Sequence, residues 1–129
     1  MDKYQFRGKF QSSATGVKVT LSLISFKEND VVIIYSPALD ISGYGNDELD
    51  AKISFEIVLE EFLRYTINKG SFEYELKKMG WKLSGKKSSR KYKQPYLDHL
   101  LKNNKYLIDI VREKEFHRIN KTVSLPAYA

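Results

Sequence analysis

The sequence predicts an α+β fold, in which an antiparallel three-stranded sheet packs on one long helix and a basic helical segment and a terminal strand follow. Three observations lead to this prediction. Residues 17–26 alternate apolar and polar side chains, which is typical of a half-buried strand. Residues 31–35 form an unbroken, mostly β-branched run, as in a strand covered on both faces. Residues 47–69 repeat apolar side chains every three or four positions, as in an amphipathic helix.

The strands and their turns can be placed in order along the first part of the chain. Residues 1–10 alternate aromatic and basic side chains, which predicts an additional edge strand. Residues 27–30 are predicted to form a hairpin turn between the first two strands of the sheet, because Asn29 and Asp30 tolerate turn conformations. Pro37 has no backbone N–H to donate, so the second strand ends there and residues 39–44 form the third.

The long helix has a capping residue at each end. Asn46 or Asp47 can accept a hydrogen bond from the first free amides, and Gly70 suits the position that closes a helix. Between them runs one apolar stripe, formed by Leu49, Ile53, Ile57, Val58, Phe62 and Tyr65. We expect this stripe to face the sheet and to form the helix side of the core.

The second part of the chain begins at a change in composition. Residues 84–94 are polar, basic and rich in turn-forming residues, which predicts an exposed linker. We therefore divide the chain into an α+β domain over residues 1–83 and a second part over residues 84–129, which holds the basic linker, helices and a terminal strand. Residues 103–104, both Asn, predict a break between two helices, and alternation over residues 119–125 predicts the final strand. This strand pairs either within the chain or with a second copy.

The charge is distributed unevenly between these two parts. The chain holds 22 basic and 16 acidic residues, a formal net charge of +6. Residues 1–83 hold 11 basic and 12 acidic residues, whereas residues 84–129 hold 11 basic and 4 acidic, so the excess lies in the second part. Such an excess either meets an anionic partner or is simply solvated. The absence of cysteine excludes disulfides, and no apolar run is long enough to span a membrane, so we expect a cytoplasmic protein without a membrane partner.

No catalytic or cofactor-binding pattern is found in the sequence. His99 and His117 lie far apart with no carboxylate cluster beside them, which argues against a metal site. No Ser occupies a G-x-S-x-G motif, and the run from Gly43 to Gly45 lacks the third glycine of a dinucleotide fingerprint. The expected strands also lack the several carboxylates that two-metal nucleases gather. We therefore predict that the chain is not an enzyme and takes no cofactor or metal.

The basic loop is the candidate nucleic-acid site. Its cations are Lys86, Lys87, Arg90, Lys91 and Lys93. Such side chains neutralise phosphates, and Tyr92 or Trp81 could stack on an exposed base. The alternative is a solvated linker whose tyrosine lies on the protein surface.

Residues 31–51 carry a motif of strand, turn, short strand and capped helix. An apolar strand ends in a Pro-x-Leu turn, a short strand ends at glycine, and an acidic helix start is followed by alanine. The positions concerned are Pro37, Leu39, Gly43, Gly45, Asp47, Asp50 and Ala51. This motif resembles the core of the HicB-like antitoxin family.

The resemblance implies a β-β-β-α, partial ribonuclease H-like fold without catalysis. Members of that family pair with a small HicA-type ribonuclease toxin and block it, and many repress their operon through a C-terminal DNA-binding part. Residues 116–126 are similar to the strand that opens a ribbon-helix-helix, but the two helices that would follow it are absent from the sequence. Operator binding therefore has no sequence support of its own.

Three functions stay open. The first is a HicB-like, non-catalytic protein that binds a small toxin and forms a homo-oligomer. The second is a nucleic-acid-binding regulatory module that uses the basic loop and the C-terminal part. The third is a stand-alone protein of this fold with a different protein partner.

Overall fold

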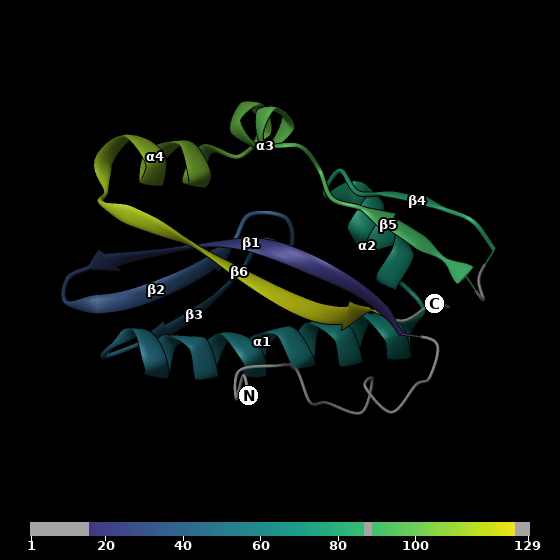
Figure 1. The fold of residues 1–129 in the computed structure, drawn as a ribbon, viewed down its shortest axis with the longest axis horizontal. Helices are drawn as coiled ribbons and strands as arrows, with labels where there is room; N and C mark the ends of the chain where they lie inside the picture. The colour runs from purple at the N-terminus through teal and green to yellow at the C-terminus, as the bar shows by residue number, and fades with distance from the viewer. Residues whose placement is uncertain (1–15, 87–88, 126–129) are drawn as a thin grey trace.

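The chain folds into a mixed α+β structure, as the sequence predicts. The computed structural model describes residues 16–86 and 89–125. Its elements are β1 (Val17–Glu28), β2 (Val31–Ser36), β3 (Ile41–Gly45), α1 (Glu48–Lys69), α2 (Phe72–Lys78), β4 (Lys82–Ser84), β5 (Lys91–Lys93), α3 (Leu97–Asn103), α4 (Lys105–Glu113) and β6 (Phe116–Leu125). An antiparallel sheet in the order β3-β2-β1-β6 lies between α1 on one face and α3 and α4 on the other (Figure 1).

The main sheet has four strands where three were predicted. β6 pairs antiparallel with β1 along its whole length, from Phe26 opposite Phe116 to Val17 opposite Leu125. The final strand therefore pairs within the chain. Its alternation is visible in the sequence, but no local pattern identifies a partner so distant in the chain. The strand predicted over residues 1–10 lies outside the described residues.

The turn between β1 and β2 depends on two residues. Asn29 and Asp30 both have positive φ, of 52° and 67°. A two-residue type I′ turn requires this conformation, which Asn and Asp adopt more readily than most residues. Glu28 and Val31 flank the turn as the first pair of the hairpin. The predicted hairpin is thus confirmed, but its turn is shorter than expected, because Lys27 and Glu28 belong to β1.

Both ends of α1 are capped as predicted. Asp47 Oδ1 accepts a hydrogen bond from the Asp50 amide at 2.8 Å. Gly70 is left-handed, with φ of 71°, and its amide donates to the Ile67 carbonyl. The helix therefore begins and ends where local sequence dictates.

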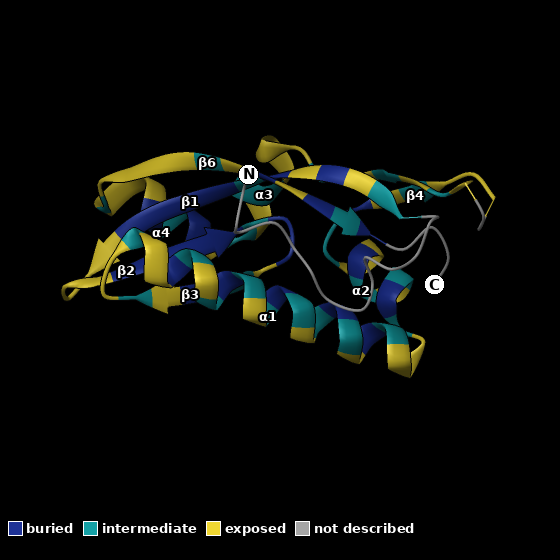
Figure 2. Cartoon of the chain, turned by 60° about the horizontal axis from the view of Figure 1, so that its bottom comes forward, coloured by how far each residue is buried: buried dark blue, intermediate teal, exposed yellow. Residues whose placement is uncertain are grey.

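The predicted core stripe of α1 is wrong, because the helix turns a different apolar face to the sheet. The residues that it buries are Ala51, Phe55, Leu59, Leu63 and Thr66. None of the residues expected in the core is fully buried. Val58 and Phe62 are half-buried, and the exposed ones are Leu49, Ile53, Ile57 and Tyr65. Figure 2 shows the exposed segments of α1 on the side that points away from the sheet.

Two glycines of β3 explain this rotation of the helix. A Cβ atom added to Gly43 would lie 2.3 Å from the Phe55 nitrogen, and one added to Gly45 would lie 2.4 Å from the Ala51 nitrogen. Only glycine allows so close an approach of helix and strand backbones. The face of α1 that carries Ala51 and Phe55 therefore packs on β3.

The two faces of the sheet bury separate apolar clusters. The larger one lies between the sheet and α1 and extends to Phe72 and Leu76 of α2 and to Trp81. The smaller one joins β1 and β2 to Leu107 and Ile110 of α4. The prediction that the second strand is covered on both faces is therefore confirmed.

The segment predicted as an exposed linker is partly ordered. β4 and β5 pair as an antiparallel hairpin across it, with Leu83 opposite Tyr92. The ring of Tyr92 packs on that of Phe72 with centroids 6.1 Å apart, so the hairpin is packed against α2. The domain division at residue 84 stays a prediction, although β4–β5 and β1–β6 pairing both join the two parts. Over the described ranges, no helix has the length and hydropathy that crossing a membrane would require.

Candidate functional site

An apolar groove of about 530 Å³ lies between the sheet and α3 and α4. One wall consists of the helix residues Leu97, Leu100, Leu101, Leu107 and Val111. The other consists of Leu23 and Ile24 of β1 with Pro37 and Ala38 from the turn after β2. α3 buries none of its residues completely, so its leucines cover the sheet without filling the space.

Large apolar side chains stay exposed around this groove. Tyr96 is 64 % exposed, Leu97 54 %, Val111 42 % and Phe116 39 %. All four line the groove. Together they extend the apolar surface beyond the cavity, across three different elements. Exposed apolar patches are frequent at interaction sites, so this surface is the candidate functional site.

A partly buried polar network, centred on the buried Tyr35, connects the start of α4 to the sheet beside the groove. The Tyr35 hydroxyl donates to Asp40 Oδ1 at 2.6 Å and accepts from Asn104 Nδ2 at 2.7 Å. Asn104 Oδ1 in turn caps α4 by accepting from the Leu107 amide at 3.0 Å. Burial and the neighbouring Asp40 carboxylate raise the pKa of Tyr35, so its phenol stays protonated and remains a donor.

The groove has a basic border. Of the described residues that line it, Lys93 and Arg118 are basic and none is Asp or Glu. Arg118 Nη2 donates to Ser22 Oγ at 3.2 Å, and Lys93 Nζ lies 4.9 Å from the centre of the Tyr96 ring. Lys93 is also directly opposite Lys82 in the β4–β5 pair, an arrangement of like charges that costs stability.

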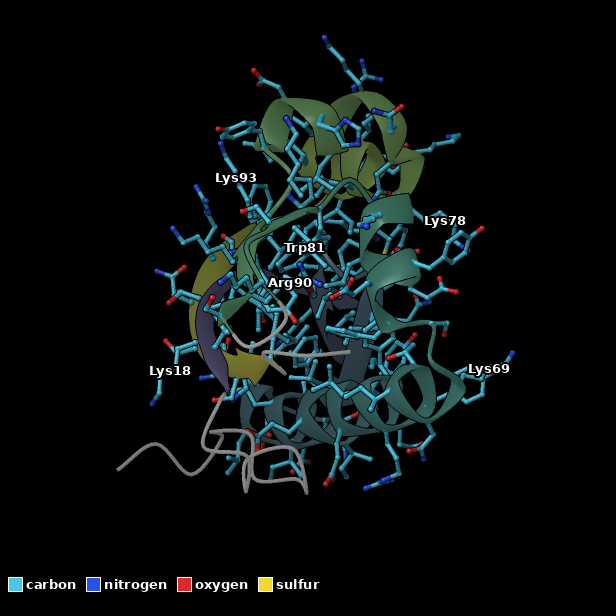
Figure 3. The ribbon with its side chains drawn as sticks, turned by 90° about the vertical axis from the view of Figure 1, so that its right-hand side faces the viewer. Lys18, Lys69, Lys78, Trp81, Arg90 and Lys93 are labelled. Atoms are coloured by element: carbon cyan, nitrogen blue, oxygen red, sulfur yellow. The ribbon has the colours of Figure 1, made fainter. Side chains whose placement is uncertain are left out.

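The cations predicted to bind nucleic acid do not all lie on one open surface, although Lys91 and Lys93 share one face of β5. Arg90 is tied down, because its guanidinium contacts Glu73 at 2.8 Å and donates to the Gly85 carbonyl at 2.7 Å. Lys86, Lys91 and Lys93 are exposed, while Lys87 lies outside the described residues. Figure 3 shows Lys18, Lys69, Lys78 and Lys93 at separate positions around this end of the molecule, with Arg90 nearer its middle.

Neither proposed stacking residue lies on an open surface. Trp81 is 2 % exposed, and its indole N–H donates to the Ala38 carbonyl at 2.7 Å. Tyr92 is half-buried against Phe72, and burial together with the charge of Glu73 raises the pKa of Tyr92 to about 12. The expectation that Trp81 could stack on a base is therefore wrong. The exposed ring next to the lysines is Tyr96, which the sequence pattern did not identify.

A second, polar pocket brings Ser25, Glu48 and His117 together. Ser25 Oγ donates to Glu48 Oε1 at 3.2 Å, and His117 Nε2 lies 2.7 Å from the same oxygen. A nucleophilic triad needs the imidazole between the hydroxyl and the carboxylate, whereas here both groups meet the carboxylate. Ser25 is also only 3 % exposed. The cluster therefore joins β1, β6 and α1 without activating the serine.

Within the described ranges, no three His, Asp or Glu side chains are grouped as a metal site would need. His99 Nδ1 lies 3.5 Å from Asn103 Nδ2 on the exposed surface of α3, and His117 contacts Glu48. The two histidines therefore make separate contacts, each with a different neighbouring residue.

The motif residues gather where β3 meets α1. Leu39 and Ala51 are buried, Gly43 and Gly45 admit the helix backbone, and Asp47 caps it. Pro37 lines the groove on the opposite face of the sheet. The motif therefore has a structural explanation in close helix–strand packing.

The chain matches no protein-family model, no curated protein and no solved structure. The resemblance to HicB-like antitoxins thus stays a prediction from the motif residues. The functional assignment depends on the groove, whose lining comes from segments far apart in the sequence. Arg118 was not predicted as a site residue, although its place in an alternating strand next to Ile119 indicates that it faces away from the larger core.

Proposed function

We propose that the chain is a non-catalytic binding protein of antitoxin type, which takes an apolar segment of a protein partner into the groove between the sheet and α3 and α4. The observation that carries this proposal is the half-open apolar groove with Tyr96, Leu97, Val111 and Phe116 exposed around it. Interface hot spots are commonly such apolar and aromatic side chains beside a preformed hollow.

The HicB-like resemblance supplies the identity of the partner within this proposal. A partial ribonuclease H-like scaffold would then sequester a small HicA-type ribonuclease in the cytoplasm. The packing of Gly43, Gly45 and Ala51 supports the proposal, because it gives the motif residues a coherent role in one scaffold.

The test is to co-express the chain with a HicA-type toxin encoded beside it. We expect the two to co-purify and the ribonuclease activity of the toxin to be blocked. Leu97→Asp should weaken binding by about 30-fold or more, as loss of an interface hot spot does. Tyr74→Asp is the matched control, because Tyr74 is 65 % exposed on α2 and does not line the groove. Full binding by Leu97→Asp, or no binding by the native chain, would contradict the proposal.

A nucleic-acid-binding module is the second candidate. It is favoured by the outer face of the β4–β5 hairpin, where Lys82 and Lys93 lie opposite one another and Lys91 follows on the same side. The triple change Lys82→Ala, Lys91→Ala and Lys93→Ala should abolish a low-salt mobility shift of a single-stranded oligonucleotide. Binding by the native chain should also weaken as salt rises. No shift at low salt would exclude this function.

We also propose that the chain forms a homodimer through the outer face of α1. Ile53 and Ile57 are 46 and 54 % exposed on this face. A β-branched residue on an open helix surface stabilises the fold neither through high helix propensity nor through burial of its side chain. Asp50 and Arg64 lie on the same face, two turns before and after Ile57. A two-fold axis at Ile57 would therefore bring each Asp50 close to the other copy's Arg64.

A further inference from the structure

We infer that the groove recognises an apolar protein segment that carries acidic side chains, which contact Lys93 and Arg118. This inference rests on the proposed binding function of the groove and adds the chemistry of its occupant. It follows from the contrast between an apolar interior and a border whose described charged residues are both basic.

The charge of the border comes first. Among the residues that the structure describes, the lining includes Lys93 and Arg118 and no carboxylate. The contacts of Arg118 and Lys93 in the described structure are with Ser22 and the Tyr96 ring, neither of which carries a negative charge. Elsewhere in the same structure Lys52, Arg64, Lys78, Arg90 and Lys105 each contact an acidic side chain. The groove cations are therefore left available to an incoming anion.

The second step is the cost of this arrangement without a partner. Lys82 stands directly opposite Lys93, and like charges at this spacing repel one another. Hydrogen bonding to Lys93, together with the charges of Lys93 and Lys82, lowers the pKa of the Tyr96 hydroxyl, as expected beside two cations. An acidic group bound there would relieve the repulsion.

The third step is the separation of the two cations. Gln94 Nε2 donates to the Thr20 carbonyl at 2.6 Å, which fixes the end of β5 beside Thr20. Arg118 Nη2 donates to Ser22 Oγ at 3.2 Å. Thr20 and Ser22 are two residues apart on β1, roughly 7 Å along the strand. The two cations therefore lie along one side of the groove, where acidic side chains of one apolar segment can contact both.

The fourth step distinguishes a protein segment from a small amphiphile. A single-headed amphiphile has one anionic group and covers only the cavity. The exposed side chains of Leu97, Val111 and Phe116 extend the apolar surface from α3 to β6. A peptide segment can cover this longer surface and supply acidic side chains to Lys93 and Arg118.

The test uses dye displacement from the full chain. The bound dye is 1-anilinonaphthalene-8-sulfonate, an apolar anion, and its neutral counterpart N-phenyl-1-naphthylamine reports the apolar contribution alone. We expect the sulfonate to bind about tenfold more tightly than the neutral dye at low salt, equivalent to about 1.4 kcal/mol. The preference should fall as salt rises, because the groove cations are at the surface.

Variants assign the preference to the two cations. Lys93→Met and Arg118→Met together should abolish the preference for the sulfonate and leave binding of the neutral dye unchanged. Lys105→Met with Arg112→Met is the matched control, because both residues are exposed on α4 and neither lines the groove. Equal binding of the two dyes by the native chain, or an unchanged preference in the groove variant, would overturn the inference.

A second arm tests the class of occupant. Three competitors displace the sulfonate: an amphipathic helical peptide with Leu on one face and Glu at both ends, the same peptide with Gln in place of Glu, and dodecanoate. The Glu peptide should displace the dye at about a tenth of the concentration that the Gln peptide needs. Stronger displacement by dodecanoate would overturn the assignment to a protein segment. Toxin binding that depends on Leu97 but not on Lys93 or Arg118 would refute this inference while leaving the proposed function intact.

Discussion

Glu48, in the first turn of α1, connects three elements through one carboxylate. It accepts a hydrogen bond from Ser25 of β1, contacts His117 of β6 at 2.7 Å, and pairs with Lys52 of its own helix at 3.4 Å. Burial alone would raise the pKa of Glu48, but His117 and Lys52 lower it below its ordinary value. Its charged form is therefore favoured in the folded state.

Replacing this carboxylate should give a pH-dependent loss of stability. Because the folded pKa of Glu48 is depressed, its contribution is present above the ordinary pKa and is lost as the pH falls through the folded pKa. Glu48→Gln should lower the free energy of unfolding at about pH 6 by about 0.3–1 kcal/mol, since the side chain is partly exposed. Urea denaturation of both proteins should converge at about pH 2, where the native carboxyl is protonated. A difference that grows with acidity would contradict this role.

Single residues that act locally were the easiest to predict. Asp47 and Gly70 cap α1 with bonds to amides and carbonyls a few positions away, and Asn29 and Asp30 need only their own backbone. Glu48 was not identified as a site residue, because its partners come from strands at both ends of the described chain. Ser25, Glu48 and His117 are all visible in the sequence, but no regular spacing between them indicates that they meet.

At the scale of the element, α1 shows why periodicity alone was insufficient. Two sets of apolar residues recur in it at four-residue steps, one from Leu49 and one from Ala51. Their starts are two residues apart, so they lie on nearly opposite faces of the helix. The close approach at Gly43 and Gly45 decides between them. A small helix residue such as Ala51, shortly after glycines in a strand, is the sequence signal that could have identified the face of α1 that packs on the sheet.

Substitutions on the two faces should therefore differ sharply. Leu59 is fully buried, and Leu59→Ala should lower the free energy of unfolding by about 2–5 kcal/mol because it leaves a cavity. Ile57 is 54 % exposed, and Ile57→Ala should change stability by less than about 0.5 kcal/mol in the monomer. Chemical denaturation at low protein concentration measures both. A large loss for Ile57→Ala in the monomer would mean that the outer face is covered within one chain.

The β4–β5 hairpin provides a second comparison at this scale. Arg90 holds its loop by contacting Glu73 of α2 and the Gly85 carbonyl, with only 13 % of its side chain exposed. Arg90→Ala should therefore lower the free energy of unfolding by about 1–3 kcal/mol. Lys86→Ala, an exposed change in the same loop, should cost less than about 0.5 kcal/mol. Equal effects of the two changes would restore the interpretation of this segment as a linker.

At the scale of the whole molecule, the groove and the sheet are products of contacts between distant segments. β6 closes the sheet beside β1, and α3 and α4 cover the face that α1 leaves open (Figure 1). Apolar spacing in the second part of the chain predicted those helices, but the face they cover depends on the Tyr35 bonds to Asp40 and Asn104. The candidate site was therefore predictable in its components and not in its assembly.

The proposed homodimer constrains the outer face of α1, because the surface at a two-fold contact must be complementary to itself. With the axis at Ile57, residues seven positions before and after it face each other across the interface, about 10 Å from the axis. Asp50 and Arg64 occupy these positions. Two copies of an acidic and a basic residue then form two equivalent ion pairs around the exposed isoleucines.

Charge reversal tests this symmetry directly. Light scattering should show a concentration-dependent dimer, which Ile57→Glu converts to a monomer. Asp50→Arg and Arg64→Asp should each weaken the dimer by about tenfold, since each leaves like charges facing. The double variant should restore it, because the exchanged pairs are again opposite in sign. Tyr74→Glu is the control that leaves the dimer unchanged, because the Tyr74 side chain is exposed on α2, away from the outer face of α1. A native chain that stays monomeric, or a double variant no better than either single change, would exclude this interface and leave the outer face of α1 to a different partner.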